Sequence, residues 1–202
     1  MTARVVPGSV ILIMDHSVIT LADDAGQETA FLSWYAITYS ARFGAGNVAL
    51  FEAPSRDLAV VLTDDVGLGE RWQGRLLDMG TGRACLRVPP VRAAFTRRPY
   101  APGGFGVRIV ADAVEVVADW AGATLPMWVD GENGKFRPEE DIWSAFIEAP
   151  DATLTVDGER LPGRAFPDDY WTRVLGRPLS SAHGAFSEVR VTPTPAQTPA
   201  SA

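Results

Sequence analysis

The sequence predicts a mainly antiparallel β protein made of two tandem related lobes, each a barrel-like β-meander with one short helix. Three observations lead to this prediction. Short runs rich in Val, Ile, Leu and Thr recur between turn residues, which is the pattern of strands. Only two segments space their apolar residues at the period of a helix. Finally, residues 18–60 match residues 114–156 at a constant offset of 96, with 11 identical pairs over 43 positions.

The matching residues concentrate at turns, where a fold constrains residue choice most tightly. The members of the first copy are Val18, Ala22, Asp23, Ala25, Gly26, Ala49, Glu52, Ala53, Pro54, Leu58 and Val60. Four of them are Ala in an Ala-rich chain, so a chance match is the alternative interpretation. We interpret the repeat as an internal duplication. It predicts an N-terminal lobe at 4–96, a C-terminal lobe at 98–192 and a disordered tail at 193–202, which lacks large apolar residues.

In the first lobe, turn chemistry separates the expected strands. Asp23 and Gly26 occupy the first and fourth positions of a type I turn, and Pro54 fixes the backbone of the next turn. A helix is expected where Leu68, Trp72, Leu76 and Met79 recur at helical spacing, with Asp64 or Asp65 as its cap and Gly80 at its end. The expected strands are 8–14, 18–22 (after a turn at 15–17), 29–42, 48–53, 58–63 and 83–88.

A basic link with Pro and Gly at 97–104 is expected to join the lobes. In the second lobe, Asp168 or Asp169 caps a short helix that carries Tyr170, Trp171, Val174 and Leu175 and ends at Gly176. The expected strands are 105–110, 114–118, 124–129, 142–149, 153–157 and 181–191. The order of elements in each half resembles a pleckstrin-homology-type lobe, and the doubled chain resembles a calycin barrel.

Composition narrows the function classes. The hydrophobic content of 47% is that of a globular protein, and the net charge of −7 argues against nucleic acid or an anionic membrane as partner. Cys85 is the only cysteine, so no intrachain disulfide is possible. The apolar run 10–14 is too short for a signal peptide or a membrane span, so a cytoplasmic protein is expected. No cofactor or metal site is predicted.

The most chemically suggestive segment is a charged loop between Trp128 and Trp143. It holds five acids, which are Asp130, Glu132, Glu139, Glu140 and Asp141, and the only lysine of the chain, Lys135. A calcium loop is one interpretation, but the glycine required at its sixth position is replaced by Lys135. A second is acid–base chemistry by Glu139, Glu140 or Asp141 near aromatic walls. The third is a solvated hairpin turn at Asn133-Gly134.

The two histidines suggest less. His16 falls in the turn expected at 15–17, and a surface position is expected for it. Ser181 and His183 share one face of a predicted strand, and residues two apart on a strand lie roughly 6–7 Å from each other. That separation is too long for a nucleophile pair, so His183 is at most a wall residue or a weak acid–base candidate.

Three functions remain as hypotheses. The first is a non-catalytic protein that binds an apolar small molecule, because six Trp, nine Phe and four Tyr supply large apolar walls. The second is an enzyme of the cyclase, isomerase or hydratase type acting on such a molecule. The third is a subunit of a protein assembly. The ligand site is expected at the rim of the second lobe, where the ligand contacts Trp128, Trp143, Asp130 and Lys135; the alternative is that both Trp side chains are core plugs.

Overall fold

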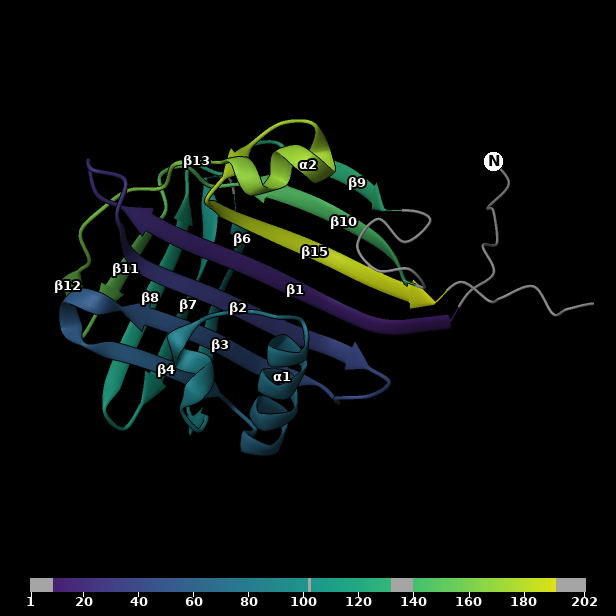
Figure 1. Cartoon of the computed structure of the whole chain (residues 1–202), viewed down its shortest axis with the longest axis horizontal. Helices are drawn as coiled ribbons and strands as arrows, with labels where there is room; N and C mark the ends of the chain where they lie inside the picture. Colours follow the sequence, from purple (N-terminus) through teal and green to yellow (C-terminus); the bar gives the residue numbers. More distant parts are fainter. Residues whose placement is uncertain (1–8, 102, 132–139, 192–202) are drawn as a thin grey trace, which may run out of the picture.

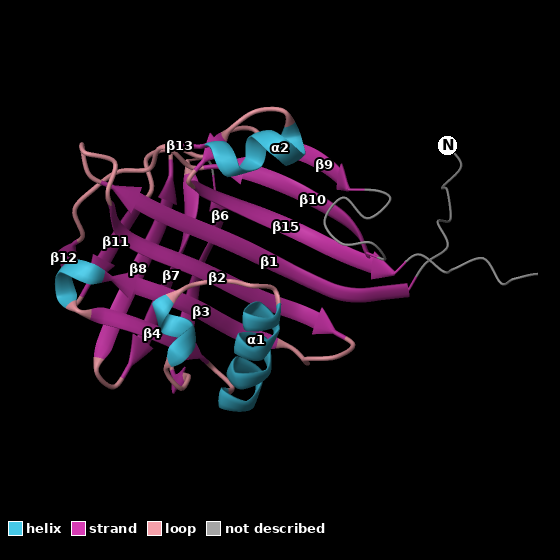
Figure 2. Ribbon diagram, in the orientation of Figure 1, coloured by secondary structure: helices cyan, strands magenta, loops and turns pink. Residues whose placement is uncertain are grey.

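The computed structural model of the chain describes residues 9–101, 103–131 and 140–191. Most of these residues form strands in two main sheets, with helices on one side of the larger sheet (Figure 1). Figure 2 shows the same elements by type, with strands as the dominant component. The prediction of a mainly β fold is therefore confirmed. Among the described residues, no helix is both long and apolar enough to cross a membrane.

The larger sheet has eight strands in the order β5-β4-β3-β2-β1-β15-β10-β9. All neighbouring strands are antiparallel except β4 and β5, which are parallel. The sheet is open, with β5 and β9 at its edges, so the barrel-like closure is not confirmed. Its strands are β1 (Ser9–Ala22), β2 (Glu28–Ser40), β3 (Gly46–Ala53), β4 (Leu58–Thr63), β5 (Val91–Arg92), β9 (Met127–Gly131), β10 (Glu140–Glu148) and β15 (Ala182–Val191).

The smaller sheet has five strands in the order β12-β11-β8-β7-β6 and packs on one face of the eight-stranded sheet. We call this the inner face and the opposite one the outer face. In Figure 1 the five-stranded sheet lies behind the larger one, and its strands cross steeply. Its members are β6 (Ala94–Ala101), β7 (Gly104–Ala111), β8 (Val114–Ala121), β11 (Thr153–Val156) and β12 (Glu159–Arg160); β13 (Pro167–Asp168) and β14 (Leu179–Ser180) form a separate ribbon.

Three apolar clusters hold these layers together. The inner cluster joins residues such as Ile19 and Phe51 of the large sheet to Ile109 and Trp120 of the small one. The second cluster lies on the outer face and includes Trp72 of α1 (Val66–Asp78) and Cys85 and Leu86 of η2 (Ala84–Arg87). The third lies under η3 (Asp169–Trp171) and α2 (Thr172–Leu175). A further short helix, η1 (Pro54–Arg56), joins β3 to β4. Apolar burial on both faces fixes the large sheet as the rigid scaffold.

Local signals in the sequence set the helix ends as predicted. The side chain of Asp65 accepts a hydrogen bond of 3.0 Å from the amide of Leu68 and so caps α1. Asp168 caps η3 in the same way, with the amide of Tyr170 as donor at 2.9 Å. Gly176 ends α2 at a φ of 73°, a left-handed conformation that favours glycine.

Three local predictions were wrong. The expected turn at 15–17 does not exist, because β1 runs without a break from Ser9 to Ala22 and pairs along its length with β2 and β15. The strand expected at 83–88 is the short helix η2. The expected link at 97–104 contains most of β6, which pairs with β7. In each case pairing or packing with distant segments overrides the local preference for a turn, strand or loop.

The internal duplication is not confirmed. In the first matching range, β1, β2, β3 and β4 pair in sequence order within one sheet. In the second range, β8 and β11 pair in the small sheet, whereas β9 and β10 pair in the large one. Strands β10 and β15 of the expected second lobe lie in the same sheet as β1, and residue 97, the expected boundary, lies within β6. The expected tail at 193–202 lies outside the described residues.

A buried carboxylate anchors η2 to the sheet. Glu52 accepts a 2.9 Å hydrogen bond from the amide of Cys85 and lies 3.4 Å from the guanidinium of Arg83, which also pairs with Glu28. Burial alone would raise the pKa of Glu52, but these donors together outweigh it and lower that pKa. Burial, together with the nearby Glu52, raises the pKa of the Cys85 thiol to about 12, so this buried thiol stays protonated.

Candidate ligand site

The five-stranded sheet covers only part of the inner face. Ser17, Ile19 and Leu21 of β1 point to this face and are buried. Ile13 and Asp15 lie on the same side of the strand because side chains alternate, yet neither belongs to a core cluster, and Ile13 is 39% exposed. A region of inner face at this end of the sheet therefore remains without an apolar cover from the described residues.

An aromatic crevice lies where the β6–β7 hairpin meets this uncovered region. Its volume is about 180 Å³, and its aromatic lining consists of Trp34, Tyr100, Phe105 and Phe186. This volume suits a single ring, because an engineered apolar cavity of about 150 Å³ binds benzene. The crevice is therefore a small apolar site and too small for a drug-sized ligand.

Stacked rings fix the walls of the crevice. The rings of Phe105 and Trp120 lie parallel with their centroids 4.9 Å apart, and Trp120 donates a 2.9 Å hydrogen bond to the carbonyl oxygen of Val18. Phe186 meets Phe105 edge-on at 6.3 Å. Phe105 approaches this closely because Gly184 has no side chain: a Cβ there would lie 2.7 Å from the Phe105 ring. The packing thus orients the rings before any ligand arrives.

Two polar features accompany these walls. Arg97 forms an ion pair with Asp15, and its guanidinium lies 4.8 Å from the centroid of the Trp34 ring. The indole N–H of Trp34 is already bonded to Asn47 at 3.1 Å. The hydroxyl group of Ser17, in contrast, makes no hydrogen bond within the described part of the chain, although the residue is buried. It therefore offers one hydrogen-bond donor to a polar atom of a ligand in the crevice, in addition to the Arg97–Asp15 ion pair.

The predicted Trp pair lies on the same face, two strands beyond Phe186. Trp128 of β9 pairs with Ala145 of β10, and Ala145 pairs with Phe186 of β15. The rings of Trp128 and Trp143 meet edge-on with centroids 5.9 Å apart. Neighbouring strands lie about 4.8 Å apart, so Trp128 is about 10 Å from the Phe186 backbone. Ala145 lies between the two aromatic groups, and we call this row of Trp128, Trp143, Ala145 and Phe186 the aromatic apron.

A buried cation supports the apron. The guanidinium of Arg190 lies 4.1 Å from the centroid of the Trp143 ring, and its Nε is 3.7 Å from a carboxylate oxygen of Glu188. This distance is that of an ion pair and exceeds that of a hydrogen bond. The indole N–H of Trp143 has no hydrogen-bond partner among the described residues. Trp128, in contrast, is 66% exposed and is not a core plug.

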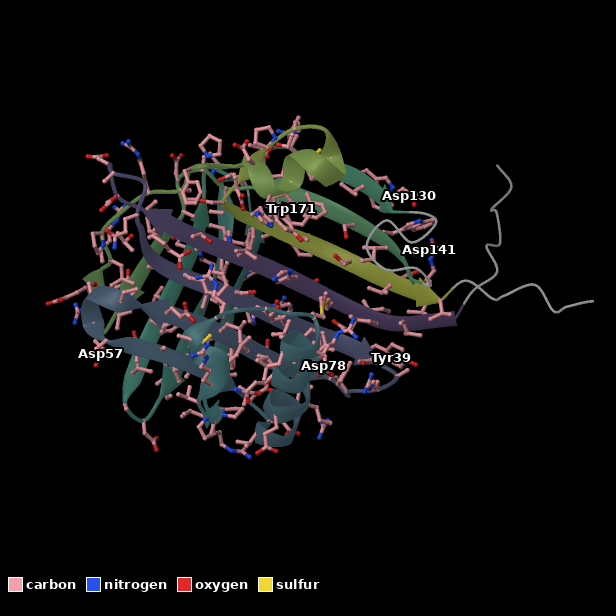
Figure 3. The ribbon with its side chains drawn as sticks, viewed as in Figure 1. Tyr39, Asp57, Asp78, Asp130, Asp141 and Trp171 are labelled. Carbon is pink, nitrogen blue, oxygen red and sulfur yellow. The ribbon has the colours of Figure 1, made fainter. Side chains whose placement is uncertain are left out.

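The structure brings together some of the predicted site residues and separates others. Asp130 lies opposite Trp143 in register, Asp141 lies opposite Arg190, and Figure 3 shows the two aspartates at the ends of β9 and β10. The backbone of Glu140 begins β10. Lys135 and Glu139 lie outside the described residues, as does the side chain of Glu140. His183 points to the outer face, on the opposite side of the sheet from the Trp pair.

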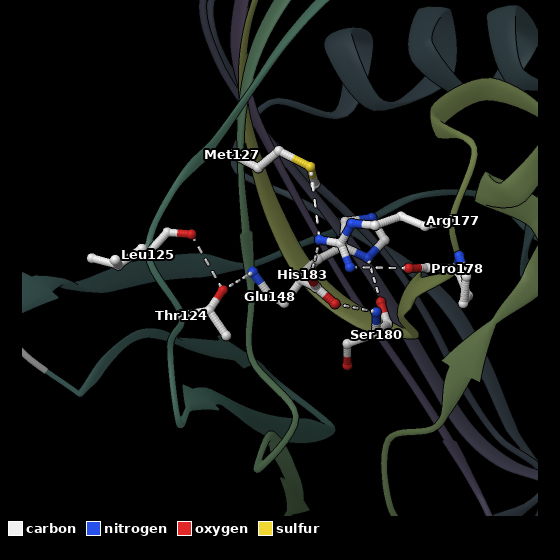
Figure 4. Close-up of polar contacts among 8 residues, drawn as sticks. All are labelled: Thr124, Leu125, Met127, Glu148, Arg177, Pro178, Ser180 and His183. Atoms are coloured by element: carbon white, nitrogen blue, oxygen red, sulfur yellow. Dashed lines mark hydrogen bonds and ion pairs between the residues drawn. The ribbon is translucent and has the colours of Figure 1, made fainter.

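His183 is held in a closed environment. It is 3% exposed, its Nδ1 lies 2.9 Å from the carbonyl oxygen of Ser180, and Trp171 packs edge-on against its ring. Glu148 lies opposite it in register but is bonded to Arg177 and to the amide of Ser180 (Figure 4). Burial lowers the pKa of His183. The hydroxyl of Ser181 donates to the carbonyl of Thr20, so it does not bond to His183.

His16 is a diagonal neighbour of His183 on the outer face; it lies within β1, not in the expected turn, and it is partly exposed. Its ring stacks on Tyr35 with centroids 4.2 Å apart, and its Nε2 lies 2.8 Å from the hydroxyl of Ser33. Burial, together with the nearby His183, lowers the pKa of His16 to about 3. Both imidazoles are therefore neutral at pH 7. In the described part of the chain, no three His, Cys, Asp or Glu residues form a group that could hold a metal ion.

The sequence did not single out the crevice residues. Trp34, Phe105 and Phe186 come from three distant segments, and only the strand pairing brings them to one place. Their alternation within predicted strands was the available signal, but it does not say which strands are neighbours. Comparison with protein-family models, with curated proteins and with solved structures found no match for this chain.

Proposed function

We propose that the protein binds a small apolar or aromatic molecule without transforming it, and that the ligand enters the aromatic crevice from the apron. The observation that supports this most directly is the ring-sized volume between Trp34, Tyr100, Phe105 and Phe186. Apolar burial of one ring stabilises the complex, and the unbonded hydroxyl of Ser17 adds selectivity for a ligand with one polar atom.

The arrangement of titratable groups favours binding over catalysis. The acid at the crevice, Asp15, is engaged by Arg97. His183 and Glu148, the nearest approach to an acid–base pair, lie on the opposite face and are bonded to other groups. The enzyme hypothesis would need a titratable group that faces the bound molecule.

A protein-assembly subunit is a second candidate, because one edge of the large sheet is apolar. Strand β9 is an edge strand, Trp128 on it is 66% exposed, and the nearby Leu125 is 90% exposed. An exposed edge strand with large apolar side chains is a common template for pairing with another chain. A concentration-dependent dimer that Trp128→Ser abolishes would favour this function.

The binding hypothesis is tested with benzene, phenol and indole as probes, by saturation-transfer NMR and by titration. Tyr100→Ala and Phe186→Ala each remove one wall of the crevice, and we expect each to weaken indole binding by about tenfold, since one aromatic contact contributes about 1.5 kcal/mol. Tyr170→Ala is the matched control, because Tyr170 is a similarly exposed tyrosine on η3. Ser17→Ala should weaken phenol binding and leave benzene binding unchanged.

Two results would refute the proposal. One is that none of the three probes binds to the folded wild-type protein. The other is that a probe binds but that Tyr100→Ala, Phe186→Ala and Tyr170→Ala affect it equally, which would place the ligand elsewhere. Far-ultraviolet circular dichroism and urea unfolding of each variant separate a lost contact from a lost fold.

A further inference from the structure

A second hollow lies on the outer face, between the second half of α1 and the loop that follows β2. Its volume is about 350 Å³, and it is lined by Arg42, Phe43, Arg71, Gly74, Arg75 and Asp78. Figure 3 shows Asp78, one of these lining residues, on α1. The hollow is separate from the aromatic crevice, because the eight-stranded sheet lies between them.

The lining of this hollow is positively charged, in contrast to the chain as a whole. Three arginines face one aspartate, whereas the net charge of the protein is −7. Within the described part of the chain, neither Arg42 nor Arg71 forms an ion pair with a carboxylate. Arg71 donates a 3.0 Å hydrogen bond to the carbonyl oxygen of Phe43. Guanidinium groups without carboxylate partners in a concave site attract anions and bind them in a bidentate manner.

Aromatic contacts hold the arginines in place. The guanidinium carbons of Arg42 and Arg75 lie 5.2 Å and 5.5 Å from the centroid of the Phe43 ring. Phe43 is itself buried against Trp72 of α1, with the two rings edge-on at 5.3 Å. Cation–π contacts of this kind reduce the freedom of long side chains. Less ordering is then required when an anion binds.

Gly74 keeps the wall of the hollow open. It lies in the middle of α1, where alanine is more favourable than glycine, and a Cβ added there meets no atom within 4 Å. The helix therefore has room for a side chain at this position but carries none. A larger side chain at this position would project into the hollow and leave the arginines unchanged. Such a substitution therefore tests whether a ligand occupies the hollow.

We propose that this hollow binds a phosphate monoester of a small organic molecule. Arg42 and Arg71, which form no ion pair within the described part of the chain, supply two guanidinium groups, which match the two charges of a phosphate dianion better than the single charge of a carboxylate. The volume falls in the range of about 300–1,000 Å³ that small-molecule sites occupy. A neighbouring hollow of about 280 Å³ shares Arg42, Phe43 and Arg75 and adds Ile11, Leu12 and Ala41, which suit an apolar organic group.

The test is titration calorimetry with phenyl phosphate, inorganic phosphate and benzoate at one ionic strength. We expect phenyl phosphate to bind more tightly than either of the others. Arg42→Gln and Arg71→Gln should each weaken its binding by about tenfold or more, since a hydrogen bond to a charged group contributes about 1.5–3 kcal/mol. Arg160→Gln is the matched control, because it removes the same charge from an exposed arginine on β12. Gly74→Leu should block binding with all charges retained, whereas Gly74→Ala should have a small effect.

Each contrary result overturns a stated part of the proposal. Absence of saturable binding of phenyl phosphate up to about 10 mM would refute the site. Equal weakening by Arg42→Gln and Arg160→Gln would show a non-specific charge effect. Tighter binding of benzoate would refute the phosphate class, and equal binding of inorganic phosphate would refute the organic group. Arg42 and Arg160 are both exposed, so these variants are expected to fold.

Discussion

The two outer-face histidines make the fold sensitive to mild acid. His16 stacks on Tyr35 and contacts Ser33, and the neighbouring His183 is enclosed by Trp171. The pKa of His16 is lowered to about 3 and that of His183 is also lowered, in both cases chiefly by burial. In the unfolded chain both groups regain a pKa of about 6.5. The unfolded state therefore binds more protons than the folded state below that pH.

The sign and size of the effect follow from this difference. The contribution of each neutral histidine to stability is fully present above pH 6.5 and is lost progressively as the pH falls below it. One pKa unit corresponds to about 1.4 kcal/mol, so lowering the pH from 7.5 to 5.5 removes at most about 1.4 kcal/mol through His16. The value is an upper bound because the His16 side chain is partly exposed, which allows water to stabilise the imidazolium. His183 adds to the loss in the same direction.

Urea unfolding at pH 7.5 and pH 5.5 measures this loss. His16→Gln keeps a neutral polar group near Ser33 and should make the free energy of unfolding less dependent on pH. Glu52 does not interfere in this window, because its lowered pKa shifts its contribution to more acidic pH. If His16→Gln retained the full wild-type difference between the two pH values, the assignment of acid sensitivity to His16 would be wrong.

Two further predictions concern the scaffold. Glu52→Gln should lower the free energy of unfolding by about 2 kcal/mol, because it leaves the half-buried Arg83 without its buried carboxylate partner. Glu28, the more exposed partner of Arg83, is the control, and Glu28→Gln should cost less than about 1 kcal/mol. Equal losses would show that burial of the pair is irrelevant. Gly104→Ala should lower the free energy of unfolding by about 3 kcal/mol or more, because a Cβ there lies 2.1 Å from a backbone carbonyl of β8 and the φ is 150°. Gly26 is the control: its φ is 78° but a Cβ there meets no atom, so Gly26→Ala should cost about 1–2 kcal/mol. Thermal unfolding compares the two, and a larger loss for Gly26→Ala would contradict this reasoning.

Features encoded within a few residues could be predicted from the sequence. The spacing of Leu68, Trp72 and Leu76 identifies the buried face of α1, and all three are buried. Asp65 and Gly176 mark helix ends because capping and left-handed turns depend on one side chain each. These signals are local, so no knowledge of distant pairing is needed to interpret them.

The pairing of distant segments could not be predicted. The polar sequence Asp15-His16-Ser17 has the composition of a turn, yet it continues β1 because its backbone pairs with β2 on one side and with β15 on the other. Ser17 is buried on the inner face, and His16 stacks on the outer one. The hydrophobic pattern of a strand does not specify which strand lies next to it. Likewise, two matching segments of the sequence need not form strands that pair in the same way.

The same limit applies to the candidate site. Trp128 and Trp143 were selected because they bracket one charged loop, and the structure places their rings in contact. Their role as ligand contacts stays a prediction. The crevice needs β2, β7 and β15 together, and the arginine-lined hollow needs α1 beside the loop after β2. Sites of this kind become visible only once the topology is known.

Both proposed sites occur where a covering layer of the large sheet ends. On the inner face, the five-stranded sheet ends at β6, and the crevice lies between that edge strand and the rings of the larger sheet. On the outer face, α1 packs on β3 and β4, toward the β5 edge of the sheet, and the arginine-lined hollow lies between the helix and the loop after β2. A packed interior leaves little empty volume, whereas the margin of a layer leaves a concave step with one rigid wall. At the crevice the eight-stranded sheet supplies that wall through Trp34 and Phe186, whereas at the hollow α1 supplies it and the loop after β2 closes the other side.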